Sequence, residues 1–182
     1  MAEKAFTFLA EGRVNVLHCP VNVSASRLTA TIQSYKGYTA IWDTGATSSV
    51  ITKKVADELE LKPISMTQVH TANGIRDCNV YSVDITLPNN INISNVNVTE
   101  ATLQGFDLLI GMDIIGLGDF AVSNHQGNTM VSYRIPSDGG VDFVKQLHEQ
   151  DKRNKSKTKS KKELKSKHKK ERQSRKKARK NK

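Results

Sequence analysis

The stretch of sequence that decides the fold lies at residues 38–51 and reads Tyr38-Thr39-Ala40-Ile41-Trp42-Asp43-Thr44-Gly45-Ala46-Thr47-Ser48-Ser49-Val50-Ile51. An apolar strand leads directly into Asp43, and the apolar run resumes at Val50 and Ile51. A carboxylate at the end of a buried strand is costly unless it is hydrogen-bonded or used. Gly45 allows a tight turn and leaves room for a substrate, and Thr44 offers a hydroxyl beside the acid. The layout predicts a carboxylate held in a rigid loop, as a catalytic acid requires.

Taken alone, this triplet of Asp, Thr and Gly is also an ordinary β-turn, because all three are common turn residues. Two later features favour the catalytic interpretation. The first is an apolar strand, a glycine and a short helix about seventy residues downstream, at Leu108-Leu109-Ile110-Gly111 and Met112-Asp113-Ile114-Ile115. The second is a hairpin between the two segments, with its tip at Ala72-Asn73-Gly74-Ile75. Asn-Gly is the strongest two-residue hairpin signal.

In this order, the three features resemble the retropepsin-like aspartic proteases, and the similarity extends over roughly residues 10–135. It is closest to bacterial retropepsin-like domain proteins. The resemblance implies that Asp43 is the catalytic acid of an active-site loop completed by Thr44, Gly45 and Ala46. It also implies a flap over the substrate at Ala72, Asn73, Gly74 and Ile75, and a supporting strand and helix that include Ile110, Gly111 and Asp113. We expect Asp113 to cap the start of its helix, which the helix dipole favours.

One departure from the family pattern concerns a charge pair. Many viral members carry an Asp where Thr47 stands and an Arg where Met112 stands, and those two side chains pair. Both charges are absent here, so the exchange leaves no unpaired partner. It affects the substrate contacts expected near Thr47, and not the catalytic acid.

The number of acids per chain predicts an assembly. The chain holds a single Asp-Thr-Gly, whereas the resemblance implies a mechanism with two carboxylates, so each subunit of a homodimer would supply one Asp43. The two would share one proton, because neighbouring carboxylates cannot easily both ionise. The ionised acid would activate a water that attacks the carbonyl of a peptide or protein substrate. No metal or cofactor is implied.

Short strands are the predominant pattern in the first 144 residues. β-branched residues alternate with polar ones at Val14 and Val16, Val21 and Val23, Val83 to Leu87, Ile91 and Ile93, and Val96 and Val98. Such alternation indicates strands with one buried face. Another strand pair is expected at about 120–122 and 130–133, joined by a turn near Gln126-Gly127-Asn128. The fold class expected is mainly β, a closed barrel or sandwich of the retropepsin type.

Two short helices interrupt the strands. The first is predicted over about residues 53–61, with Thr52 as N-cap and Pro63 beyond its end. The second follows Gly111. A third helix is expected to start near Asp142 and to fray into the C-terminal segment.

Charge divides the chain into two predicted domains, a protease domain at 1–144 and a basic tail at 145–182. Residues 1–144 hold 9 Lys and Arg against 14 Asp and Glu, a formal charge of −5, and the tail holds 19 against 4, or +15. From Asp151 onward only Leu164 and Ala178 are apolar. Such a segment cannot bury enough surface to offset the entropy of ordering, so we expect disorder, with transient helix as the alternative.

Two interpretations of the tail stay open. Residues 152–182 could attach without sequence specificity to nucleic acid or another acidic surface, or serve only as a solvated extension. The corresponding alternative for the whole protein is a catalytically silent binding module with the protease fold, tethered by its tail.

We expect neither a secretory signal nor a membrane span. The first residues form no long apolar run, and no stretch approaches the roughly 20 apolar residues of a membrane span. We therefore expect a cytoplasmic protein in which Cys19 and Cys78 are reduced. Cys78 is expected to be a small buried side chain without a catalytic role.

Overall fold

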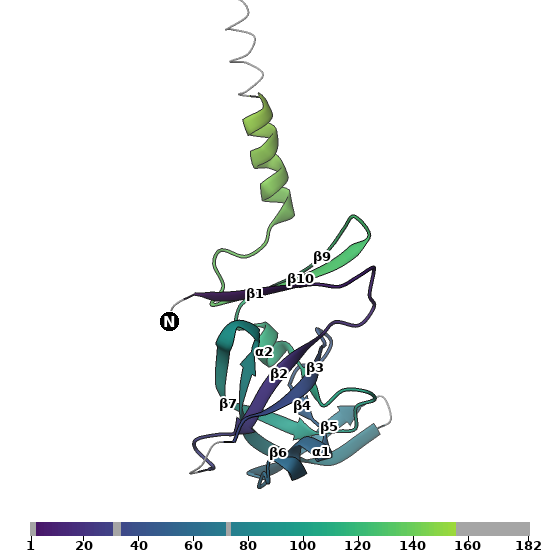
Figure 1. The fold of residues 1–182 in the computed structure, drawn as a ribbon, viewed down its shortest axis with the longest axis vertical. Helices are drawn as coiled ribbons and strands as arrows, with labels where there is room; N and C mark the ends of the chain where they lie inside the picture. The colour runs from purple at the N-terminus through teal and green to yellow at the C-terminus, as the bar shows by residue number, and fades with distance from the viewer. Residues whose placement is uncertain (1–2, 31–33, 72–73, 156–182) are drawn as a thin grey trace, which may run out of the picture. The chain divides into compact units, whose positions relative to one another are not determined.

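The computed structural model describes residues 3–30, 34–71 and 74–155, without the side chains of residues 69–71. The chain divides into two compact units, residues 1–140 and 141–182. The first contains the strands and two short helices, and the second contains one exposed helix (Figure 1).

The main element of the first unit is a closed barrel. In the described part of the chain it consists of six strands, which follow one another around the barrel as β2 (His18–Ala25), β3 (Lys36–Trp42), β8 (Leu108–Ile110), β4 (Val50–Ile51), β7 (Ile91–Glu100) and β6 (Gly74–Leu87). The pairing of β2 with β6 closes the ring. Most neighbours are antiparallel, but β3 pairs parallel with β8 and β4 pairs parallel with β7. The mainly β barrel expected from the sequence is confirmed.

Two further groups of strands extend from this barrel. The β5 strand (Ser65–Thr71) pairs with the first half of β6 to form a hairpin. A separate three-stranded sheet has the order β1 (Lys4–Leu9), β10 (Asn128–Ile135) and β9 (Asp119–His125). Short helical segments link the strands at α1 (Lys53–Glu58), η1 (Pro88–Asn90) and α2 (Met112–Ile115).

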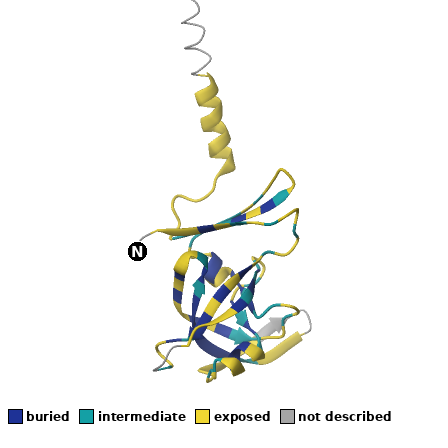
Figure 2. Cartoon of the chain, in the orientation of Figure 1, coloured by how far each residue is buried: buried dark blue, intermediate teal, exposed yellow. Residues whose placement is uncertain are grey.

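The alternation of buried and exposed residues along the strands produces the core (Figure 2). The largest side chains that are almost completely buried are mainly aliphatic, with Tyr133 as the aromatic exception. Trp42 stacks on Phe120 with ring centroids 5.1 Å apart, and its ring also lies 5.3 Å from that of Tyr133 and 6.1 Å from that of Phe6. These aromatic contacts join the end of β3, which leads into Asp43, to the three-stranded sheet.

Several strand predictions need correction. The alternation of Val14 and Val16 does not produce a strand. The two strands expected at 91–93 and 96–98 form one continuous strand, β7. Asn95, which lies between the two segments, has a positive φ of 59°. The strand β1 was not predicted.

The helix predictions agree with the structure in their positions. Helix α1 begins after Thr52, whose hydroxyl makes no capping hydrogen bond, and it ends at Glu58 rather than near 61. Helix α2 follows Gly111, as expected.

The second unit contains a helix over residues 143–155. Asp142 caps it, since its Oδ1 accepts the Lys145 amide at 2.9 Å and its carbonyl accepts the Gln146 amide at 3.1 Å. The helix continues through 151–155, where disorder was the main expectation, and all of its described residues are exposed. The rest of the predicted tail, 156–182, lies outside the described residues.

Candidate active site

The predicted catalytic acid lies where β3 ends beside β8. Trp42 pairs with Ile110, and the next amide, that of Asp43, donates to the Ile110 carbonyl at 3.0 Å. The Asp43 side chain is half-buried. Its position is therefore set by a strand from a distant part of the sequence as well as by its own.

The loop after Asp43 turns back onto the carboxylate. The Gly45 amide donates to Asp43 Oδ1 at 2.8 Å, and the Ala46 amide donates to the Asp43 carbonyl at 3.3 Å. A Cβ at position 45 would lie 3.2 Å from Asp43 Oδ1, a close contact that glycine avoids. Thr44 is exposed. The carboxylate is thus oriented by an amide while one side of the loop stays open.

The supporting segment packs closely under this loop. Gly111 is buried, and a Cβ there would lie 2.7 Å from the carbonyl carbon and oxygen of Ser48 and 3.1 Å from the Ala46 oxygen. The Met112 amide donates to the same Ala46 carbonyl at 2.8 Å. Only glycine permits this approach of two backbones.

Asp113 is not the helix cap that was expected, and it binds the Asp43 loop instead. The N-cap residue of α2 is Gly111, and Asp113 lies in the first turn, where Oδ1 accepts the Ile114 amide at 3.0 Å. Both carboxylate oxygens also bind Ser49, a buried residue at the end of the Asp43 loop. This role of Ser49 was not predicted, because no local sequence pattern indicates it.

The predicted flap corresponds to the β5–β6 hairpin, in which Thr71 pairs with Gly74 and the strands continue to Ser65 and Val80. Gly74 has a φ of +110°, a conformation that L side chains rarely adopt. Ile75 is 58% exposed. The other two predicted flap residues, Ala72 and Asn73, lie outside the described residues.

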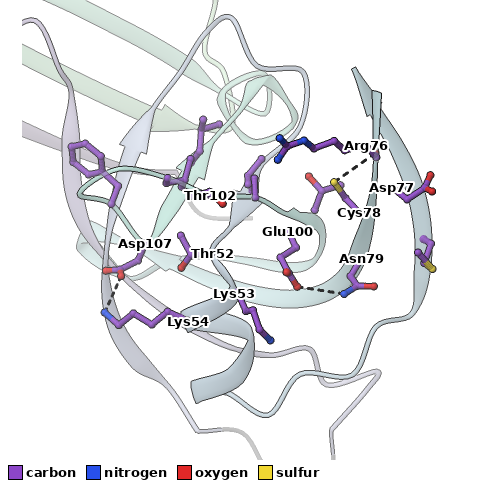
Figure 3. Close-up of a pocket in the computed structure, with 17 residues that line it drawn as sticks. Thr52, Lys53, Lys54, Arg76, Asp77, Cys78, Asn79, Glu100, Thr102 and Asp107 are labelled. Carbon is purple, nitrogen blue, oxygen red and sulfur yellow. Dashed lines mark hydrogen bonds and ion pairs between the residues drawn. The ribbon is translucent and has the colours of Figure 1, made fainter. Parts of the chain in front are cut away.

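A cavity of about 1020 Å³ lies within the first unit, lined by the flap strand β6, by the segments around β4 and α1, and by residues 99–109 (Figure 3). Its apolar lining residues are Val50, Met66, Ala101, Leu103, Phe106 and Leu109. Val50, which directly follows the Asp43 loop, pairs with Leu109. No residue of the loop itself, 43–49, is among the described residues that line the cavity. The lining residues were not predicted from the sequence.

Charged groups also line this cavity. Lys54 pairs with Asp107 at 3.0 Å, and Glu100 accepts the Tyr81 hydroxyl at 2.7 Å. Burial, followed by this hydrogen bond, raises the pKa of Tyr81. In Figure 3 the Arg76 side chain extends toward the cavity. The cavity therefore has both apolar and charged side chains in its wall.

Cys78 also lines the cavity, and it is half-buried rather than buried as expected.

Among the described residues, no group of three or more His, Cys, Asp or Glu side chains could hold a metal ion. None of the described helices has the length and apolar character needed to cross a membrane.

Comparison with known proteins gives the following matches. The family model of the gag-polyprotein putative aspartyl proteases matches residues 28–116, which contain the Asp43 loop, the flap hairpin, β8 and α2. Among curated protein sequences, none matches the chain significantly.

Solved structures with similarity to the chain include three proteins. The crystal structure of a retropepsin-like aspartic protease from Rickettsia conorii is 15% identical over 74% of this chain and 96% of that one, with a TM-score of 0.45. The solution structure of the protease of Simian Foamy Virus (mac) is 15% identical over 54% and 92%, with a TM-score of 0.37. The retroviral protease-like domain of Ddi1 from Leishmania major is 18% identical over 59% and 76%, with a TM-score of 0.32.

Proposed function

Since this chain belongs to the retropepsin-like aspartic proteases, we propose that it is an endopeptidase whose active site forms between two copies of the chain. The observation that carries the proposal is the Asp43 carboxylate, which is half-buried at a strand end and oriented by the Gly45 amide at 2.8 Å. A group held in this way is preorganised for proton transfer.

The proposed reaction is general acid–base catalysis by the two Asp43 side chains. One carboxylate is ionised and removes a proton from a water molecule, which attacks the carbonyl carbon of the scissile peptide bond. The other is protonated and donates a hydrogen bond to the carbonyl oxygen. The pair now holds two protons, and one of its carboxyl groups gives a proton to the leaving nitrogen. The tetrahedral intermediate then collapses, and the pair again shares a single proton.

Homodimerisation follows from the count of one such acid per chain. The three-stranded sheet supports it independently, because within the described residues β1 and β9 are its outer strands. Outer strands present unpaired backbone groups and so favour association with another strand. The exposed Thr44 would lie close to its counterpart across the twofold axis.

We assign the cavity beside Val50 and Leu109 to the binding of substrate side chains, with the β5–β6 hairpin as its cover. Its mixture of apolar and charged lining side chains suits a peptide that places a large apolar side chain next to polar ones. The Ile75 side chain, exposed near the hairpin tip, is available to contact such a peptide.

Cleavage of a peptide library by the purified full-length protein tests this proposal. Asp43→Asn should lower kcat/KM by a factor of at least about 10³, since it removes the general base while retaining the shape of the side chain. Asp57→Asn is the matched control, because Asp57 is an exposed carboxylate on α1 that pairs with the exposed Lys53. Equal cleavage by the wild type and Asp43→Asn would refute the proposal. A wild-type protein that cleaves nothing would favour the silent binding module instead.

A further inference from the structure

Ser49 is the centre of a hydrogen-bond network outside the Asp-Thr-Gly triplet. Its side chain is fully buried. Its hydroxyl donates to Asp113 Oδ1 at 2.7 Å and accepts the Gly111 amide at 3.0 Å, and its own amide donates to Asp113 Oδ2 at 3.0 Å. One carboxylate from α2 therefore holds both the side chain and the backbone of this serine.

The network fixes one end of the loop that carries the catalytic acid. At the beginning of the loop the Asp43 amide binds the Ile110 carbonyl, and at its middle the Ala46 carbonyl binds the Met112 amide. At its end, immediately before β4, the loop is held by the bonds from Ser49 to Asp113 and Gly111, and by the Ser49 carbonyl, which accepts the Thr99 amide at 3.3 Å. The first two attachments use backbone atoms only, so the third is the one that a side-chain substitution can weaken, through the bonds that Ser49 makes with Asp113 and Gly111.

We infer that Asp113 is a positioning residue, which fixes the Asp43 loop through Ser49 and thereby sets the separation of the two catalytic carboxylates in the dimer. The inference rests on the proposed function and extends it. Two carboxylates share one proton only while they lie close together, and their coupling splits the apparent pKa values of the pair. If the loop loses its attachment at Ser49, the mean separation increases, the coupling weakens and the two apparent pKa values converge.

The activity test compares Asp113→Ala, Ser49→Ala and the double variant with wild type and with Asp57→Ala, the exposed-carboxylate control. We expect kcat to fall roughly 10- to 100-fold for each single variant with KM changed less than about twofold, because misplacement of reacting groups acts on the chemical step. The bell-shaped pH profile of kcat should narrow. The double variant should lose less than the product of the two single losses, since both substitutions remove the bond from the Ser49 hydroxyl to Asp113.

The variant Asp113→Asn distinguishes a loss of loop positioning from a failure of the protein to fold. The amide oxygen of asparagine can still accept the Ser49 amide, but its NH₂ group cannot accept the Ser49 hydroxyl proton. Its kcat and the width of its pH profile should therefore lie between those of wild type and Asp113→Ala. A pH profile of unchanged width in all of these variants, or a double variant whose loss equals the product of the single losses, would overturn the inference.

Amide hydrogen exchange measured by NMR tests the same inference without activity. In Asp113→Ala, the amides of Asp43 and Met112 should exchange faster, although their own hydrogen bonds are not removed by the substitution. The Ala10 amide, which binds the Thr129 carbonyl at 2.8 Å, is the internal control and should be unaffected. Unchanged exchange at Asp43 and Met112 would refute the role of Asp113 even if wild type proved active. Faster exchange would support it even if the proposed protease activity failed.

Discussion

The amide of Asp43 donates to the carbonyl of Ile110 at 3.0 Å, which joins the candidate catalytic acid to a strand that lies far from it in sequence. The next residue, Gly111, lies directly against the backbone of Ser48. The position of the acid therefore depends on how closely β8 can approach the loop.

Gly111→Ala should disturb this approach. The added Cβ would lie 2.7 Å from two backbone atoms of Ser48, so the loop or β8 must shift. We expect a loss of about 1–3 kcal/mol in the free energy of unfolding, measured in urea, because overpacking costs that much. Cleavage activity should fall about 100-fold, since small displacements of catalytic groups have effects of that size. Gly37→Ala on β3 is the control, because its Cβ would meet only Asn22 Oδ1 at 3.6 Å. Equal stability of the two variants would contradict this account.

Acid should weaken the first unit through Asp119. The Ser137 hydroxyl, the Asp138 amide and the Arg134 guanidinium all donate to this carboxylate and lower its pKa from 3.8 to about 2. A pKa lowered by folding means that the stabilisation is complete above about pH 4 and is lost as pH falls through about 2. The difference in urea midpoint between wild type and Asp119→Asn should therefore shrink between pH 4 and pH 2.

Asp77→Asn, which changes an exposed carboxylate on β6, is the control for this titration. The difference in urea midpoint between wild type and Asp77→Asn should vary less with pH than the difference between wild type and Asp119→Asn. If the Asp119→Asn difference stayed constant from pH 5 to pH 2, the bonds from Ser137, Asp138 and Arg134 would not stabilise the ionised carboxylate.

The alternation of apolar and polar residues predicted the barrel strands well. It failed where contacts with distant residues determine the conformation of a segment. Val21 and Val23 lie on β2 with their side chains buried, as the alternation predicted. Val14 and Val16 show the same alternation without a strand. Their segment is held instead by Thr129, whose amide donates to Gly12 and whose hydroxyl accepts the Val14 amide. A single-residue pattern contains no information about such a partner.

In the candidate site, too, residues in short motifs were predicted and contacts between distant residues were not. Resemblance and turn chemistry identified Asp43, Gly45 and Gly111, because each occupies a short motif with a constrained backbone. The bonds between Ser49 and Asp113 could not be predicted, since they join residues 64 positions apart and neither side chain has a distinctive local pattern. The cavity was missed for the same reason, because its walls come from separate strands.

The two cysteines should differ in reactivity. Cys19 is buried beneath Trp42, whose Nε1 donates to its Sγ at 3.2 Å, and burial raises the pKa of this thiol to about 11. At pH 8 it should therefore react very slowly, since the thiolate is the nucleophile. Cys78 is half-buried in the cavity wall and should react first. A disulfide reagent should detect one rapidly reacting thiol in the native protein and two in urea, and Cys78→Ser should abolish the rapid reaction. Rapid labelling of native Cys78→Ser would show that Cys19 is accessible.

Mixed subunits should reveal whether the catalytic pair is shared. A dimer with one Asp43→Asn subunit retains a single carboxyl group, which cannot act as base and acid at the same time. If subunits assort randomly, mixing wild type with a threefold excess of Asp43→Asn should reduce the activity per wild-type subunit to about one quarter. The same excess of Asp57→Asn subunits should cause no loss, which controls for dilution and crowding. Sedimentation of the mixture should show that dimers persist. Activity per wild-type subunit that is independent of added Asp43→Asn would mean that one chain contains the whole catalytic apparatus, because a monomer is unaffected by an inactive neighbour.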